Sequence, residues 1–221
     1  MTHRDRNDLQ QAIEHANQLE ESGQLAMAEA EFAAVCEKDP TAAVAWYGAA
    51  LLAAQRDDYG LARRRAEKLV EVDPLAHDAV GLLGRICSAQ GEFEFGEKYL
   101  DAAIYMDPES VENIVAMGVM LDSRARWLVQ MGENGAADYW SRAETLFRRA
   151  LLLSPYDAEI HFNLAVVLGQ QGEDREQEEE LEEVLKHQHN SPIARELLEW
   201  IRSGKPTYMP ICNSTAEEPI P

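Results

Sequence analysis

Helix-like runs of apolar and polar residues along the chain stop at regularly spaced prolines. Pro40, Pro74 and Pro108 lie 34 residues apart, and Pro155 follows after 47. A proline ring removes a backbone donor and pushes the preceding residue out of the α region, so a proline typically ends a helical segment. The spacing therefore predicts a 34-residue repeat of paired amphipathic helices, with extra residues inserted into the fourth copy.

Other columns of the repeat keep the same register. When each proline is numbered position 32, positions 8 and 20 hold mostly small residues, whereas positions 24 and 27 hold apolar ones. Small residues let two antiparallel helices approach closely, and larger ones fill the space between neighbours. The predicted core is therefore Ala16, Ala50, Gly84, Gly118, Ala165 (position 8); Ala28, Ala62, Gly96, Ala143, Gln177 (20); Phe32, Ala66, Leu100, Phe147, Leu181 (24); Val35, Leu69, Ala103, Ala150, Val184 (27). Turn residues recur near position 15, as Gly23, Asp57, Gly91 and Gly172.

The combined pattern resembles the tetratricopeptide repeat, a 34-residue helix-turn-helix unit, with Trp46 at position 4, Gly84 at position 8 and the prolines at position 32. The resemblance implies an all-α fold, a right-handed α-solenoid of five repeats near 9–42, 43–76, 77–110, 111–157 and 158–191. Ser191 and Pro192 then begin a capping helix over 192–203, with Gly204 just past its end. The predicted domain is a single solenoid over 1–204, and a proline-rich tail follows it at 205–221.

The insertion in the fourth repeat predicts an extended hairpin. No helix breaker occurs between Arg124 and Met131, whereas the segment from Gly132 to Gly135 indicates a turn. Two interpretations of the large apolar residues in this extension stay open. They pack the two helices against each other, or they form an interface with a partner or a second copy of the chain. These residues are Trp127, Leu128, Met131, Tyr139 and Trp140.

Charge narrows the classes of partner. The chain carries 40 acidic and 20 basic side chains, a formal net charge of −20, and residues 173–183 alone hold eight acids and one arginine. Such a charge repels nucleic acid and anionic membrane surfaces. No apolar run reaches the roughly 18 residues of a membrane span, and no apolar signal region follows the N-terminus. We therefore expect a cytoplasmic protein with reduced thiols, no nucleic-acid partner and no membrane insertion.

The sequence contains no recognisable catalytic or metal-binding motif. We find no glycine-rich phosphate loop, calcium loop or nucleophile elbow. His187 and His189 form the only close histidine pair and lack further ligands. Cys36 lies next to a core column of the first repeat, and Cys87 lies at position 11 of the third; both are interpreted as small buried hydrophobes. We expect no enzyme activity, no cofactor and no metal.

The family resemblance also implies a binding surface. In tetratricopeptide-repeat proteins the first helices of the repeats line a concave groove that binds peptides, chiefly through positions 2, 5, 9 and 12. Carried over by column, positions 5 and 9 give an apolar centre with Tyr47 and Phe162 as candidate anchors. An apolar centre flanked by acids suits an amphipathic segment that carries lysine or arginine. The predicted groove residues are Ile13, Asn17, Tyr47, Leu51, Arg85, Val115, Val119, Phe162 and Val166, and the predicted rim acids are Asp78, Glu112, Asp122 and Glu159.

The pattern of the heat-shock cochaperones is absent. Their two-carboxylate clamp, which holds acidic EEVD-type C-termini, needs Lys, Asn, Asn, Lys and Arg at five groove positions. Only Asn17 matches among the residues found there, which are Ile13, Asn17, Gly48, Asp78 and Leu82. The favoured function is a non-catalytic protein-interaction module, an adaptor or assembly factor. Two alternatives stay open: a cytosolic chaperone for an exported or membrane-bound client, and, from another class, a regulatory subunit of an enzyme.

Overall fold

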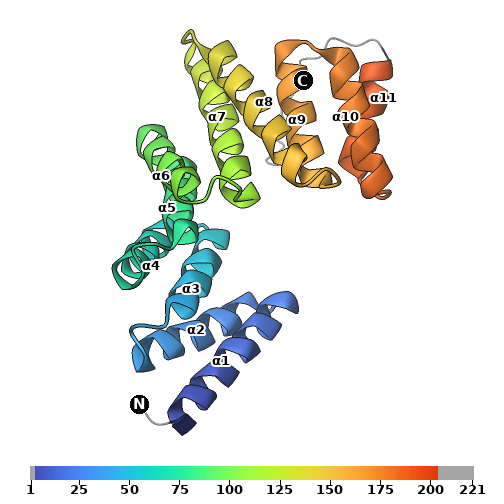
Figure 1. Ribbon diagram of the computed structural model, residues 1–221. Coiled ribbons are helices and arrows are strands. Elements are labelled where there is room, and N and C mark those ends of the chain that lie inside the picture. The colour runs from blue at the N-terminus through green and yellow to red at the C-terminus, as the bar shows by residue number, and fades with distance from the viewer. Residues whose placement is uncertain (1–2, 204–221) are drawn as a thin grey trace, which may run out of the picture. The chain divides into compact units, whose positions relative to one another are not determined.

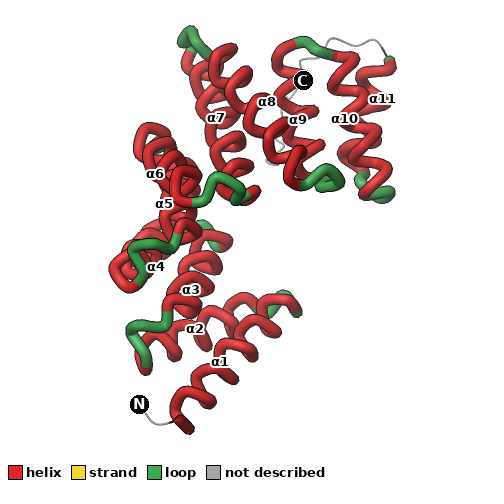
Figure 2. Tube along the Cα trace, viewed as in Figure 1, coloured by secondary structure: helices red, strands yellow, loops and turns green. Residues whose placement is uncertain are grey.

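The computed structural model describes residues 3–203, with side chains from Asn7 onward, and this part of the chain forms eleven α-helices and no strand. The fold is therefore all-α, as predicted, and Figure 2 shows the helices joined by short loops. In chain order the helices are α1 (His3–Glu21), α2 (Leu25–Lys38), α3 (Ala43–Gln55), α4 (Tyr59–Val72), α5 (His77–Ala89), α6 (Phe93–Met106), α7 (Val111–Met131), α8 (Ala136–Leu153), α9 (Ala158–Gln171), α10 (Asp174–His187) and α11 (Pro192–Arg202). None of these helices combines the length and apolar character needed to cross a membrane.

Two compact units divide the chain, Met1–Met120 and Leu121–Pro221, and their boundary falls inside α7. In unit 1, α1 packs on α2, α3 on α4 and α5 on α6, and Figure 1 shows each of these as an antiparallel pair. In unit 2, α9 packs on α8 and on α10, and α11 covers the other side of α10. The pairs α1/α2, α3/α4, α5/α6 and α9/α10 each correspond to one predicted repeat, and α11 corresponds to the predicted capping helix.

The predicted core columns are confirmed. Every residue at positions 8, 20, 24 and 27 is buried, including the atypical Gln177 of the last repeat. Between α5 and α6, positions 8 and 20 are both glycine. A Cβ added to Gly84 would lie 2.6 Å from Cγ of Leu100, which is itself fully buried. This contact accounts for glycine at a position where the other repeats have alanine or glycine and none has a larger residue.

Neighbouring repeats fit together through complementary side-chain sizes. The Phe32 ring of α2 lies over Gly48 of α3, where an added Cβ would be 2.6 Å from the ring carbon Cζ. One repeat later the sizes are exchanged, because Ala66 stands at the position of Phe32 and Leu82 at the position of Gly48. Ala66 and Leu82 belong to the same buried cluster. The two interfaces therefore fill similar volumes with opposite arrangements, which keeps the packing dense.

The predicted turns adopt left-handed backbone conformations. Gly23, Asp57, Gly91 and Gly172 have φ values of 78°, 60°, 76° and 80° between the two helices of their repeats. Asp57 is the only residue other than glycine with positive φ in the described part of the chain. Its carboxylate accepts a hydrogen bond from the Tyr59 hydroxyl at 2.7 Å, and aspartate tolerates this conformation better than most side chains.

In two repeats, the side chain at position 4 hydrogen-bonds to the loop that precedes the repeat. The Trp46 indole Nε1 donates to the Pro40 carbonyl oxygen at 3.0 Å. In the fifth repeat His161 takes the place of tryptophan, and its Nε2 lies 3.0 Å from the Pro155 carbonyl oxygen. The same bond thus recurs with a different side chain, between position 4 and the proline six residues earlier.

The capping helix begins as predicted. The Ser191 hydroxyl accepts from the Ala194 backbone N–H at 3.3 Å, and Pro192 occupies the first turn of α11. Arg202, at the end of α11, donates to Glu178 at 2.5 Å and Glu182 at 2.6 Å, both on α10. The predicted stop at Gly204 and the tail over 205–221, with Cys212, lie outside the described residues.

Candidate functional site

The first-helix face of unit 1 is the surface formed by positions 5 and 9 of α1, α3, α5 and the start of α7. Seven of the nine predicted groove residues lie on this face, and none of the seven is buried. Asn17 and Val119 are exposed, and the others are half-buried: Ile13, Tyr47, Leu51, Arg85 and Val115. The remaining two, Phe162 and Val166, are half-buried on α9 in unit 2.

A polar network links three successive first helices on this face. Arg85 of α5 pairs with Glu112 of α7, with Nη1 2.7 Å from Oε1. The Tyr47 hydroxyl of α3 donates to the same Oε1 at 3.3 Å. The column pattern predicts Arg85 in the groove and Glu112 at its rim but does not predict their contact. Their signal was present in the columns, since an arginine at position 9 and a glutamate at position 2 of the next repeat carry opposite charges.

Tyr47 stays a hydrogen-bond donor at neutral pH. Burial, together with the charges of Glu112 and Asp78, raises the pKa of its phenol to about 12, although Arg85 opposes the increase. A neutral phenol beside a carboxylate donates its proton into a bond that the phenolate could not make. The phenol therefore keeps its proton for the bond to Glu112 at neutral pH.

Arg85 has donor capacity that the described residues do not use. Its Nη2 atom is buried and has no hydrogen-bond acceptor there, whereas Nη1 is held by Glu112. A buried donor without a partner costs about 1–3 kcal/mol. The Arg85 side chain as a whole is one-third exposed, so the guanidinium lies at the surface although Nη2 itself is buried.

Position 5 of the third repeat is closed rather than open. Gly81 is buried, and a Cβ added there would lie 1.9 Å from Oδ1 of Asn113. Asn113 is itself 3% exposed and has Nδ2 3.4 Å from Nδ1 of His77. Asn113 thus covers the glycine and brings α7 against α5, a contact that the column pattern did not predict.

Three of the four predicted rim acids are exposed. Asp78 and Glu112 lie on the surface of unit 1, and Glu159 lies on the surface of unit 2. The prediction for Asp122 is wrong, because this carboxylate is only 6% exposed. The extension of α8 brings Trp140 to it, and the indole Nε1 donates to Oδ1 at 3.1 Å. Arg126 pairs with the other oxygen at 2.8 Å.

The extended pair of helices in unit 2 has an inner and an outer set of apolar residues. α7 continues to Met131 and α8 begins at Ala136, after the turn that contains Gly132 and Gly135. The inner set packs in one cluster, with Leu128 8% exposed and Tyr139 and Trp140 half-buried against Ala125 and Ala136. The outer set is Trp127, 40% exposed, and Met131, 54% exposed. An interface with a partner or a second copy stays a prediction for this outer set.

Asp122→Asn tests the buried carboxylate through the pH dependence of stability. Burial raises the pKa of Asp122 above its ordinary value of 3.8, while Arg126 and the Trp140 N–H partly counteract the increase. The folded chain therefore holds this proton more tightly than the unfolded chain, so ionisation above about pH 4 costs stability. Asparagine keeps an acceptor for Trp140 and does not ionise. Urea unfolding should show the variant gaining stability relative to the wild type from about pH 4 to pH 7.

The exposed Asp138, on α8 of the same unit, provides the matched control. Asp138→Asn should not show the gain in stability that burial of the carboxyl predicts for Asp122→Asn. A difference for Asp122→Asn that stays flat, or that shrinks as the pH rises, would contradict the assignment of a buried, proton-retaining carboxyl.

The acidic segment 173–183 is largely engaged in ion pairs within unit 2. Glu178 and Glu182 are held by Arg202, and Glu176 lies 2.5 Å from Nη2 of Arg148 on α8. Glu180 lies 2.6 Å from Nδ1 of His161, a buried side chain of α9. Much of the negative charge on α10 therefore stabilises helix packing, which weakens the case for α10 as a docking surface.

The comparisons with known proteins agree with this repeat structure. Residues 47–111 match the family model described as Tetratricopeptide repeat. No curated protein matches the chain. The match by sequence therefore covers the second and third predicted repeats, and similarity over the remainder comes from solved structures.

Three solved structures illustrate that similarity. PilW, described as a widely conserved type IV pilus biogenesis factor, is 15% identical, with a TM-score of 0.74 over 88% of this chain and 84% of its own. A thermophilic TPR protein from Thermus thermophilus is 18% identical, with a TM-score of 0.71 over 88% of this chain and 99% of its own. YrrB, described as a TPR protein with an unusual peptide-binding site, is 21% identical, with a TM-score of 0.56 over 85% of this chain and 90% of its own. At these identities the similarity establishes the fold.

Proposed function

We propose that this chain, whose residues 47–111 match the tetratricopeptide-repeat family, is a non-catalytic interaction module that binds a basic, amphipathic segment of a partner protein on the first-helix face of unit 1. The observation that carries the proposal is the unused Nη2 donor of Arg85. It lies on the same face as the exposed Val119 and the half-buried Leu51. A surface that combines an unpaired donor with apolar side chains is incomplete until an acceptor and an apolar group cover it.

An extended or helical segment supplies the groups that this face lacks. When the partly exposed Arg85 side chain turns toward the segment, a main-chain carbonyl oxygen of the segment accepts from Nη2. Apolar side chains of the segment cover Val115, Val119 and Leu51. Lysine or arginine on the segment pairs with Asp78, which is exposed beside the network. A carboxylate is a poor occupant here, because Glu112 already neutralises Arg85 and Asp78 adds a further negative charge. The proposal accordingly excludes acidic C-termini of the EEVD type.

The rigidity of the face favours an adaptor or assembly factor over the two alternatives. Tyr47, Arg85 and Glu112 hold each other across three helices, which presents a fixed arrangement of donors and acids. Fixed polar groups suit one particular segment, whereas binders of varied clients depend on adaptable surfaces. No observation on the described residues favours a chaperone of many clients or a regulatory subunit over a single-segment adaptor.

Photo-cross-linking combined with Val119→Lys tests the proposed binding face. Benzoylphenylalanine at Val119 should cross-link a partner in cells, and purified partner should bind the Val119→Lys variant at least about tenfold more weakly. A lysine there both removes apolar contact and repels a basic segment, effects that together exceed about 1.4 kcal/mol. Binding of the purified partner is measured by calorimetry against the wild-type chain.

Leu75, 82% exposed in the loop between α4 and α5, provides the matched control in the same unit. Benzoylphenylalanine at Leu75 should not capture the partner, and Leu75→Lys should bind it with unchanged affinity. The proposed binding face would be wrong if both lysine variants lost the same affinity for the partner. It would also be wrong if the partner cross-linked only from Trp127 or Met131.

A further inference from the structure

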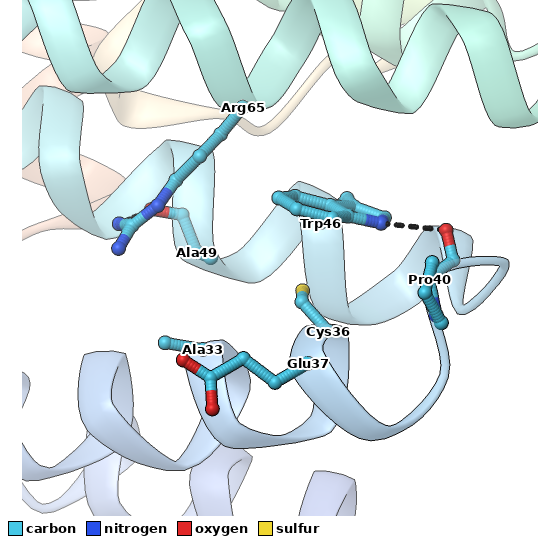
Figure 3. Close-up of a pocket in the computed structure, with 7 residues that line it drawn as sticks. All are labelled: Ala33, Cys36, Glu37, Pro40, Trp46, Ala49 and Arg65. Carbon is cyan, nitrogen blue, oxygen red and sulfur yellow. Dashed lines mark hydrogen bonds between the residues drawn. The ribbon is translucent and has the colours of Figure 1, made fainter.

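A hollow of about 320 Å³ lies on the second-helix side of unit 1, away from the first-helix face. Its walls come from α2, α3, α4 and the loop between α2 and α3, and they consist of Ala33, Cys36, Glu37, Pro40, Trp46, Ala49 and Arg65 (Figure 3). Ala49 and Tyr47 lie two residues apart on α3, about 200° around the helix, so the hollow and the groove network use opposite sides of the same element. The volume is at the lower end of the roughly 300–1,000 Å³ range of ligand pockets.

The hollow exists because two columns of the repeat carry small residues at this one place. Position 7 is Ala49 here but Leu83, Met117 and Leu164 in the next three repeats. Position 28 is Cys36 here but Val70, Ile104, Leu151 and Leu185 in the others. The larger side chains would occupy space that alanine and cysteine leave open. The cavity is thus specific to the junction of the first two repeats.

The interior of the hollow is apolar and chemically inert. Figure 3 shows the Trp46 ring on one side and Ala33 and Glu37 on the opposite side, with Cys36 between them. The indole N–H is already committed to the Pro40 carbonyl oxygen at 3.0 Å. Burial raises the pKa of the Cys36 thiol to about 11, so the sulfur stays a neutral, soft wall atom at physiological pH. Such a lining takes an apolar group and offers it no hydrogen bond.

Charge at the mouth selects what accompanies that apolar group. The charge of Arg65 is neutralised within the protein, because Nη1 donates to Glu29 and to the Ala49 carbonyl oxygen, each at 2.7 Å. Glu37 is exposed, and no ion pair of the described residues involves it. The charge left available at the rim is therefore negative. A lysine or arginine next to the apolar group complements it.

From this geometry we infer that the second-helix hollow is a separate docking site for a partner segment, which inserts an apolar side chain between Trp46 and Ala33 and pairs an adjacent lysine or arginine with Glu37. The site goes beyond the proposed groove function, since it lies on another side of unit 1 and shares no residue with it. A chain with both sites can hold two segments at once, which matches the task of an adaptor or assembly factor.

Nuclear magnetic resonance of the full chain with defined peptides tests the inference. The probe is acetyl-Leu-Arg-amide, compared with acetyl-Leu-Gln-amide and acetyl-Ala-Arg-amide, and the readout is the indole N–H signal of Trp46, assigned with Trp46→Phe. Acetyl-Leu-Arg-amide should shift this signal saturably and leave the indole signals of Trp127, Trp140 and Trp200 in place. The glutamine peptide should bind up to about fivefold more weakly, the upper range of a surface ion pair, and the alanine peptide should give no saturable shift.

Two filling variants and one charge variant complete the design. Ala33→Leu should abolish the shift, and Cys36→Leu, which copies the leucine of the last two repeats, serves as a second filling variant should the first fail to fold. Glu37→Gln should make the arginine and glutamine peptides bind equally. Glu31→Gln, which changes an α2 glutamate that does not line the hollow, should keep their difference. The inference is overturned by the absence of a saturable Trp46 shift, by undiminished binding to a folded filling variant, or by equal binding of the leucine and alanine peptides.

Discussion

Phe32→Ala should lower the free energy of unfolding by about 3–5 kcal/mol, the range for removing a fully buried phenylalanine. The ring is 1% exposed and fills the junction between the first two repeats above Gly48. The reverse change, Gly48→Leu, should also destabilise, by about 1–3 kcal/mol, because an added Cβ would already lie 2.6 Å from the ring. Chemical denaturation followed by circular dichroism measures both effects.

The double variant Phe32→Ala with Gly48→Leu provides the sharper test. It reproduces at this junction the arrangement that Ala66 and Leu82 have one repeat later. The leucine fills volume that the lost ring leaves, so the double variant should be more stable than Phe32→Ala alone, with a coupling of at least about 1 kcal/mol. If the losses in the free energy of unfolding of the two single variants simply add in the double variant, the exchange of large and small residues does not contribute to the packing of this junction.

Glu29→Gln should lower the free energy of unfolding by about 2–3 kcal/mol. Glu29 is 8% exposed and receives hydrogen bonds from both Arg56 and Arg65. Removing one charge of a buried pair typically costs about 3–5 kcal/mol, and the loss is smaller here because the Arg56 side chain is 54% exposed. In the variant the positive charge of Arg65, whose side chain is 13% exposed, has no negative partner at Glu29. Urea unfolding at low salt measures the change.

Two controls separate the buried charge from other effects of the substitution. Glu37→Gln changes an exposed glutamate on the same helix and should stay within about 0.5 kcal/mol of the wild type. Replacing both Glu29 and Arg65 with methionine removes the charge pair together and should cost less than Glu29→Gln alone. If the double variant instead loses more free energy of unfolding than Glu29→Gln, the ion pair itself stabilises the fold.

The repeat columns predicted the fold well because they describe local contacts. Position 8 of one helix meets position 20 of the next within about a dozen residues of chain, so a small residue in both columns specifies the contact from the sequence alone. The turns at Gly23, Asp57, Gly91 and Gly172 followed for the same reason, since a left-handed backbone is a property of one residue in one place. The capping helix was readable from its Ser-Pro start.

The candidate sites were less predictable, because they depend on which side chains of distant segments come together. Asp122 occupies a groove column and was expected at the rim, yet the lengthened α8 places Trp140 against it and buries it. Tyr47 and Glu112 are 65 residues apart, and only the stacking of three helices lets them share a hydrogen bond. The hollow beside Trp46 arises from small residues on two helices, neither of which is unusual in isolation.

The sequence by itself determined the helices, their pairing within repeats, the buried columns and the surface that carries the groove positions. These properties depend on periodicity and on neighbours close in the chain, which a linear pattern records. The tertiary structure alone decided which groove residues bind each other, that Arg85 keeps an unused donor, that Asp122 is buried and that a hollow opens on the second-helix side. The physical reason is that burial, hydrogen-bond saturation and empty volume are set by all the side chains around a point, and those come from several repeats at once.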